Sequence, residues 1–114
     1  MKRVTMNLLA ATLAVLPFTA SAAAPTPAAG MPALLAQRRC NACHDVSRML
    51  IGPPFSAIAV RYRAAKEQKV ETLAHKIVTG GGGAWGVVPM VPNEHVPLDE
   101  ARAMARWILD LPAP

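Results

Sequence analysis

Residues 40–44, Cys-Asn-Ala-Cys-His, form the pentapeptide that decides how the rest of the sequence is interpreted. A Cys-x-x-Cys pair alone is compatible with a disulfide, a redox dithiol or half of a zinc site. A thioredoxin-like dithiol needs a strand–helix–strand context, which the flanking sequence does not indicate. Structural zinc favours four ligands, so zinc stays open only if His44, His75 and His95 complete the set. The histidine directly after the second cysteine favours attachment of a c-type haem.

The chemistry of haem attachment accounts for this spacing. Two thiols add to the two vinyl groups on one edge of the macrocycle. Two intervening residues on a helical turn let Cys40 and Cys43 reach the same edge, and His44 can then offer its imidazole to the iron. We therefore predict one haem c, bound covalently through Cys40 and Cys43, with His44 as an axial ligand.

The first 22 residues have the layout of a cleaved secretory signal peptide. A basic start is followed by an apolar run over residues 8–18 and by Ala20-Ser21-Ala22, a suitable cleavage site. The apolar run is shorter than the roughly 20 residues that span a bilayer, which disfavours a membrane anchor. Because haem attachment occurs outside the bacterial cytoplasm, we expect a periplasmic location and no stable membrane insertion after cleavage.

Cleavage after Ala22 would leave 92 of the 114 residues, which we divide into a disordered or extended Pro/Ala tether, 23–30, and one domain, 31–114. The formal charge would fall from +5 to +3, with 10 basic and 7 acidic residues. The basic residues are scattered, so nucleic acid is not an expected partner. The apolar core of so small a chain is marginal, and a large cofactor would stabilise it. We expect a monomer.

Four segments carry helical signals, and no convincing strand is indicated. Residues 31–44 are rich in Ala and Leu, and residues 54–64 and 70–79 place apolar side chains at i, i+3, i+4 and i+7. Gly80 is a candidate C-cap. Residues 97–111 carry Asp99 and Glu100 in their first turn, which suits a helix N-terminus. The predicted fold class is all-α, with about four helices wrapped around the haem.

The second axial ligand has to come from the remaining methionines and histidines. The candidates are Met31, Met49, Met90, Met104, His75 and His95. Met90 is favoured because it follows His44 by 46 residues, enough chain to reach the opposite face of a haem. Pro89 and Pro92 shape its surroundings without secondary structure.

The glycine-rich stretch 80–93, "GGGGAWGVVPMVPN", contains Met90. No Lys-Ser/Thr follows the glycines, so this stretch is not a P-loop. Glycines let the backbone pass close to a haem edge, and the stretch is predicted to form the distal wall of the haem pocket.

Four segments, "CNACH", "IGPPF", "GGGGAWGVVPMVPN" and "DEARAMARWILDL", together resemble the short bacterial class I cytochromes c of the cytochrome c-551/c-552 type. The resemblance implies the class I cytochrome c fold and a periplasmic one-electron carrier, which is not an enzyme. Such a carrier passes electrons from a quinol-oxidising complex or another cytochrome to a terminal reductase or oxidase, by transient docking at an exposed haem edge. A sensor or a peroxidase-like haem subunit with a labile sixth ligand is the alternative.

The resemblance also implies roles for individual residues. These are Met90 as distal ligand, Gly52-Pro53 as carbonyl partner of His44, Trp85 and Lys76 near the haem propionates, Asn93 as donor to the Met90 sulfur, and Trp107 packed on the N-terminal helix. Departures from the family pattern are Val87 and Val91 in place of prolines, Lys76 in place of arginine, and Pro97 in place of a capping serine. Arg38, Arg39, Arg48, Arg61 and Arg63 could steer the protein towards acidic partners.

Overall fold

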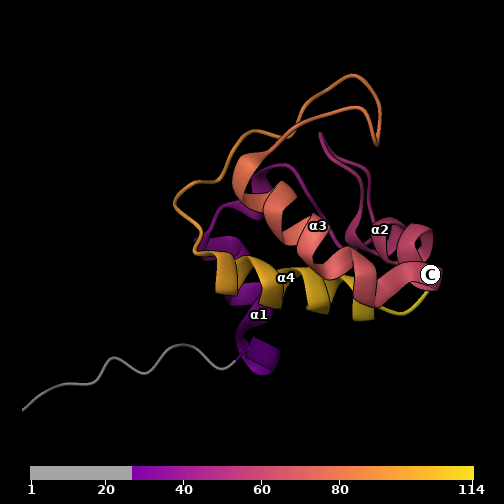
Figure 1. Ribbon diagram of the computed structural model, residues 1–114, viewed down its shortest axis with the longest axis horizontal. Coiled ribbons are helices and arrows are strands. Elements are labelled where there is room, and N and C mark those ends of the chain that lie inside the picture. Colours follow the sequence, from indigo (N-terminus) through magenta and orange to yellow (C-terminus); the bar gives the residue numbers. More distant parts are fainter. Residues whose placement is uncertain (1–26) are drawn as a thin grey trace, which may run out of the picture.

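The computed structural model describes residues 27–114, which form four α-helices, with long connections between the first and second and between the third and fourth (Figure 1). The helices are α1 (Pro27–Gln37), α2 (Phe55–Tyr62), α3 (Lys66–Thr79) and α4 (Leu98–Asp110), with short 3-10 turns η1 (Cys40–Ala42) and η2 (Arg63–Ala65). Within these residues the only β pairing is an isolated bridge between Gly81 and Met90. The predicted all-α class is therefore confirmed. The predicted signal peptide, residues 1–22, lies outside the described part of the chain.

Helix α4 is the platform on which the other three helices pack. Ala101 and Ala105, one turn apart, are fully buried, and these small side chains allow neighbouring helices to approach closely. The core that surrounds them consists of apolar side chains from every helix: Met31, Leu34 and Leu35 of α1, Phe55 and Ile58 of α2, Val70, Ala74 and Ile77 of α3, and Met104, Ile108 and Leu109 of α4. None of the helices described between residues 27 and 114 is long and apolar enough to cross a membrane.

Helix α1 differs from the prediction at both ends. It begins at Pro27, so residues 27–30 of the predicted tether are helical and are not extended. It ends at Gln37, because Arg39 adopts the left-handed conformation with φ of 64° and Cys40 then begins a separate 3-10 turn. The predicted continuous helix over 31–44 is therefore wrong beyond residue 37. The break separates the turn that holds the two cysteines from α1.

The other three helices follow the predictions closely. Helix α3 begins at Lys66, four residues earlier than predicted, because its first turn is polar and shows no apolar spacing. It ends at Thr79, and Gly80 follows as the C-cap, with φ of 69° and its N–H donated to the carbonyl oxygen of Lys76 at 2.8 Å. Helix α4 starts after Pro97, which provides no side-chain cap, as expected from the replacement of serine.

Three ion pairs tie α4 to its neighbours. Arg38, just after α1, makes a two-pronged contact with Glu100, both bonds at 2.8 Å, and about three-quarters of each side chain is buried. Arg102 similarly contacts Glu71 of α3 at 2.7 and 3.0 Å, which lowers the pKa of Glu71. Lys66, the first residue of α3, pairs with Asp110, the last residue of α4. Arg38 matters most for the site, because it fixes the chain immediately before the cysteines.

Candidate haem site

A cavity of about 780 Å³ is lined both by the Cys-x-x-Cys-His segment and by the glycine-rich segment that ends near Met90. This volume is within the range of about 300–1,000 Å³ that is typical of ligand and cofactor sites. The inner wall is largely apolar and comes from all four helical regions: Leu35, Phe55, Ile58, Tyr62, Leu73, Ile77, Met104 and Ile108. Such a wall suits a large apolar group.

Both cysteine thiols are free and line this cavity. The carbonyl oxygen of Cys40 accepts the N–H groups of Cys43 at 3.1 Å and His44 at 3.0 Å, so one tight turn holds all three residues. Burial raises the pKa of the Cys40 thiol, which keeps it protonated and neutral at neutral pH. Two free thiols and an adjacent imidazole on an apolar wall are the groups that covalent attachment of a haem requires.

The imidazole of His44 is oriented by its surroundings. Its Nδ1 donates to the carbonyl oxygen of Pro53 at 2.8 Å. Because a carbonyl oxygen can only accept, the proton is fixed on Nδ1, and Nε2 keeps its lone pair for a metal. The ring also stacks on Phe55, with centroids 5.2 Å apart and an interplanar angle of 17°. Phe55 in turn contacts Trp107 edge-on at 6.1 Å.

Gly52 leaves the space that the His44 ring occupies. A Cβ at this position would lie 2.4 Å from Cε1 and 2.8 Å from Nδ1 of His44, closer than any real contact. The Gly52 N–H also donates to the carbonyl oxygen of Cys43 at 2.8 Å. The structure therefore gives the predicted Gly52-Pro53 pair two separate tasks: Gly52 makes room for the ring, and Pro53 accepts its proton.

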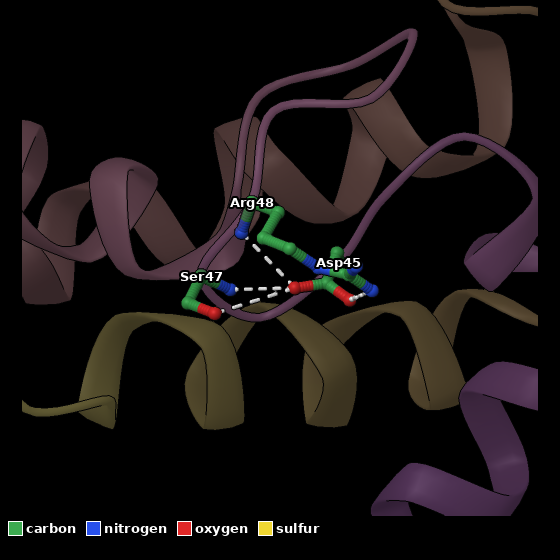
Figure 2. Close-up of polar contacts among 3 residues, drawn as sticks. All are labelled: Asp45, Ser47 and Arg48. Atoms are coloured by element: carbon green, nitrogen blue, oxygen red, sulfur yellow. Dashed lines mark hydrogen bonds and ion pairs between the residues drawn. The ribbon is translucent and has the colours of Figure 1, made fainter.

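A compact turn directly after His44 starts the loop that leads to Pro53. The carboxylate of Asp45 accepts the backbone N–H groups of Ser47 at 2.9 Å and Arg48 at 3.0 Å, and the guanidinium of Arg48 at 3.1 Å (Figure 2). The Arg48 side chain, followed by these backbone donors, holds the pKa of Asp45 well below its usual range. The Asp45 carbonyl oxygen accepts the N–H of Phe55 at 2.9 Å, which closes the loop.

The glycine-rich segment, which also lines the cavity, forms a closed loop with Met90 at its base. The N–H of Gly81 donates to the Met90 carbonyl oxygen, and the Met90 N–H donates to the Gly81 carbonyl oxygen, both at 2.9 Å. A Cβ on Gly80 would lie 2.4 Å from the Met90 carbonyl oxygen, so the main chain can close only with glycine there. The orange segment after α3 in Figure 1 contains this loop, which extends away from the helices. Met90 itself is half-buried and packs against the core.

Asn93 anchors the base of this loop to α3. Its Nδ2 donates to the carbonyl oxygens of Ile77 at 3.0 Å and Val91 at 3.1 Å, and its backbone N–H donates to Val78 at 2.9 Å. This differs from the predicted bond to the Met90 sulfur, because backbone carbonyls take the amide donors. Asn93 still lines the cavity.

Lys76 and Trp85 place polar groups along the same cavity. Lys76 lies half-buried on α3. Its Nζ passes close to the backbone of Gly81, so that a Cβ added to Gly81 would lie 2.9 Å from it. The guanidinium of Arg61 lies 4.6 Å from the centre of the Trp85 ring, and its Nη1 donates to the Ala84 carbonyl oxygen at 2.5 Å. From the sequence, Arg61 is expected only to be one of the arginines that steer the protein towards acidic partners, and its contact with Trp85 is not predicted. No local signal points to a contact 24 residues away.

The remaining ligand candidates fall into two groups. Met31 is fully buried in the core and His75 is exposed on α3, and neither lines the cavity. Met49, Met104 and His95 do line it, together with Met90. Among residues 27–114, no three His, Cys, Asp or Glu side chains gather as a metal-binding group, so the zinc alternative lacks its donor set there.

The helices, the free thiol pair and the oriented histidine together define a small class I monohaem cytochrome c. No family model matches the chain, but individual proteins do. The chain is 40% identical over 95 residues to cytochrome c-551 of Allochromatium vinosum, a match that covers 82% of this chain and 98% of that protein. It is 42% identical over 78 residues to cytochrome c-552 of Hydrogenobacter thermophilus, covering 68% and 78%.

The fold comparison agrees with these sequence matches. The crystal structure of wild-type cytochrome c552 from Nitrosomonas europaea matches with a TM-score of 0.67 and 41% identity, over 71% of this chain and 99% of that one. The chain belongs to the cytochrome c-551/c-552 family of class I monohaem cytochromes. Like the members of this family, it is an electron-transfer protein and not an enzyme. The relatives therefore confirm the family and the activity that the sequence predicts.

Proposed function

We propose that this chain is a periplasmic one-electron carrier whose haem c is attached through Cys40 and Cys43 and ligated by His44 and Met90. The observation that carries the proposal is the shared cavity: free thiols and an oriented imidazole on one segment, and Met90 on another. When bound, the haem supplies the Fe(III)/Fe(II) couple. The protein holds both ligands still as the charge changes.

Met90 is the best-supported second ligand among the side chains at the cavity. Its backbone N–H and carbonyl are both fixed by Gly81, so the thioether starts from a defined point. Met49 follows His44 by only five residues, on the loop of the same wall, and is 66% exposed. Met104 is fully buried in the helical core. A thioether is soft and neutral, favours Fe(II) and raises the reduction potential, which suits an electron carrier.

Lys76 and Trp85 are the residues proposed to bind the haem propionates. The ammonium of Lys76 and the indole N–H of Trp85 are donors without acceptor capacity, and carboxylates accept from both. Both side chains line the cavity from the α3–loop side. Lys76 replaces an arginine, so its contact is a point charge and lacks the geometry of a guanidinium fork.

Exposed apolar side chains that also line the cavity form its rim: Met49, Ile51, Val87, Val88 and Val91. A small apolar patch over a cofactor edge is suited to brief redox encounters, which bury less than about 1,200 Å². We propose that this rim docks on redox proteins, with a quinol-oxidising complex or another cytochrome as donor and a terminal reductase or oxidase as acceptor. The protein acts as a monomer without nucleic-acid partners, and the surface arginines steer it towards acidic surfaces.

A Met90→Ala variant tests the ligand assignment. The wild-type oxidised protein should show a weak far-red sulfur-to-iron band, and the variant should lose it and fall steeply in reduction potential. Met49→Ala is the matched control, because it removes a thioether from the same cavity and should change neither property. A Met90→Ala variant that keeps both would show that another side chain binds the iron. Ready binding of CO by the wild-type protein would instead favour a sensor or a peroxidase-like subunit.

A further inference from the structure

We infer that Arg61 is a positioning residue that holds the tip of the glycine-rich loop, residues 82–89, and with it Trp85 at the polar edge of the haem site. Arg61 lies in the last turn of α2, far in sequence from the loop. The inference rests on the proposed function only in that it takes Trp85 and Met90 as parts of a haem site. The contacts of Arg61 are all with residues of this chain and do not depend on the haem.

Arg61 makes three contacts, of which two reach the loop and one is to Tyr62, its neighbour in α2. Its Nη1 donates to the Ala84 carbonyl oxygen at 2.5 Å. Its guanidinium carbon lies 4.6 Å from the Trp85 ring centre and 5.7 Å from the ring centre of Tyr62. Tyr62 is half-buried and lines the cavity, so the guanidinium links an inner-wall aromatic side chain to one on the loop.

The loop has few other means of keeping its shape. At its base it is closed by the Gly81–Met90 pair, and inside it the N–H of Gly83 donates to Gly86 at 3.2 Å. Gly83 and Gly86 have positive φ and open space around them, and Val87 is 98% exposed. Within residues 27–114, the Arg61 bond is the only side-chain hydrogen bond that reaches residues 82–89. Without it, the tip would be restrained mainly from its base.

The chemistry of the contact requires arginine. A planar guanidinium can lie over an aromatic face while an N–H in its plane reaches a carbonyl oxygen. A lysine ammonium is a point charge on a flexible stem and cannot keep both contacts in one geometry. Arg61 thereby limits the positions open to the indole of Trp85. It touches neither of the proposed ligands, and acts on Met90 only through the loop.

The test uses the haem-loaded protein and three variants, Arg61→Ala, Arg61→Lys and Arg63→Ala. Arg63 is the matched control, because it carries the same charge two residues away, is exposed and makes no side-chain hydrogen bond to the described residues. The readouts are hydrogen exchange at the amides of Gly81, Gly83 and Met90, and the NMR resonance of the Trp85 indole N–H. Exchange at α4 amides serves as the internal reference.

We expect Arg61→Ala to speed exchange at the three loop amides by about tenfold, the effect of losing one hydrogen bond and one cation–π contact. The Trp85 resonance should shift and broaden, with α4 unchanged. Arg61→Lys should recover less than half of the protection, and Arg63→Ala should match the wild type. Unchanged loop exchange in Arg61→Ala, an equal effect of Arg63→Ala, or equal acceleration in α4 would each overturn the inference. These readouts do not need Met90 to bind iron, so a failed ligand assignment would be seen separately.

Discussion

The Nδ1 atom of His44 lies 2.8 Å from the carbonyl oxygen of Pro53, and this one bond sets both the tautomer and the direction of the imidazole. The turn at Asp45 and the absence of a side chain on Gly52 bring that oxygen into place. The hydrogen bond that orients His44 is therefore made within the ten residues that follow the cysteine pair, and the ring is supported from α2 by stacking on Phe55. Changes within this short loop should act on His44 directly.

The first prediction concerns Gly52→Ala. The added Cβ would lie 2.4 Å from the His44 ring, so the ring, the loop or both must move. We expect a loss of about 1–3 kcal/mol in the free energy of unfolding, the usual cost of overpacking, together with a changed reduction potential. Denaturant unfolding and potentiometry of the haem-loaded protein measure the two effects.

Gly30→Ala is the control for this substitution. Gly30 lies in α1, and a Cβ there would meet nothing within 4 Å. It should therefore gain about 0.5–1 kcal/mol from helix propensity and leave the potential unchanged. If both glycine variants behaved alike, the space at Gly52 would have no special part in placing His44.

The second prediction concerns acid stability. The pKa of Asp45 is lowered in the folded protein, first by the Arg48 side chain and then by two backbone donors. An Asp side chain has a pKa of about 3.9 in the unfolded chain. Because the pKa of Asp45 is lower in the folded protein, its charged form stabilises the fold at pH values above about 3.9. This stabilisation is lost as the pH falls through the pKa of the folded protein. Asp45→Asn should therefore be less stable than the wild type at pH 7, with a difference that shrinks below about pH 4. Denaturant unfolding between pH 7 and pH 2 measures it.

Glu94→Gln is the comparison for the acid series. Glu94 is exposed, and the structure of residues 27–114 gives its carboxylate no hydrogen-bond partner. Its substitution should change the free energy of unfolding at pH 7 much less than Asp45→Asn does. A pH-independent difference between Asp45→Asn and the wild type would contradict the proposed role of the Asp45 charge.

The third prediction concerns the backbone of Arg39. With φ of 64°, this residue has a left-handed conformation that costs an L-residue roughly 1–2 kcal/mol. Glycine avoids that cost but loses about 0.5–1 kcal/mol to chain entropy. Arg39→Gly should therefore be more stable than Arg39→Ala by up to about 1 kcal/mol, as measured by denaturant unfolding. Equal stability of the two variants would mean that the chain between α1 and Cys40 relaxes when the side chain is removed.

The fourth prediction concerns the ion pair between Arg38 and Glu100. Its two bonds are short and its side chains are mostly buried, whereas the Arg102–Glu71 pair is more exposed. A double-mutant cycle of Arg38→Ala and Glu100→Ala should give a coupling energy that is favourable and only weakly reduced at 1 M salt. The same cycle on Arg102 and Glu71 should lose most of its coupling at that salt concentration. Equal salt sensitivity would show that burial does not protect the first pair.

Much of the fold could be predicted because periodic apolar spacing marks a helix wherever one face is buried. Helices α2 and α4 follow this rule, and so does α3 from Val70 onwards. The polar first turn of α3 carries no such spacing, so the sequence predicts a start at Val70, whereas the helix begins at Lys66. The sequence predicts a helix as far as residue 44, whereas α1 ends at Gln37, because composition does not indicate that Arg39 has a positive φ.

Within the site, local motifs were more informative than distant contacts. The spacing of Cys40, Cys43 and His44 specifies chemistry within one turn, and Pro53 is only nine residues from the ring that it orients. The contact of Arg61 with Trp85 joins residues far apart in the chain, and periodicity carries no information about such pairs. Asn93 shows the same limit, because its choice of backbone carbonyls depends on how α3 ends.

The rings of His44, Phe55 and Trp107 run in contact from the cysteine segment to α4. A local opening that frees α4 must also remove the support of Phe55, and then that of His44. The glycine-rich loop is held separately, by Asn93 at its base and Arg61 at its tip. The protein should therefore open in two independent cooperative units, with the loop side released at lower free energy than the aromatic side. Partial unfolding would then expose the distal face of the pocket while the proximal histidine stays in place.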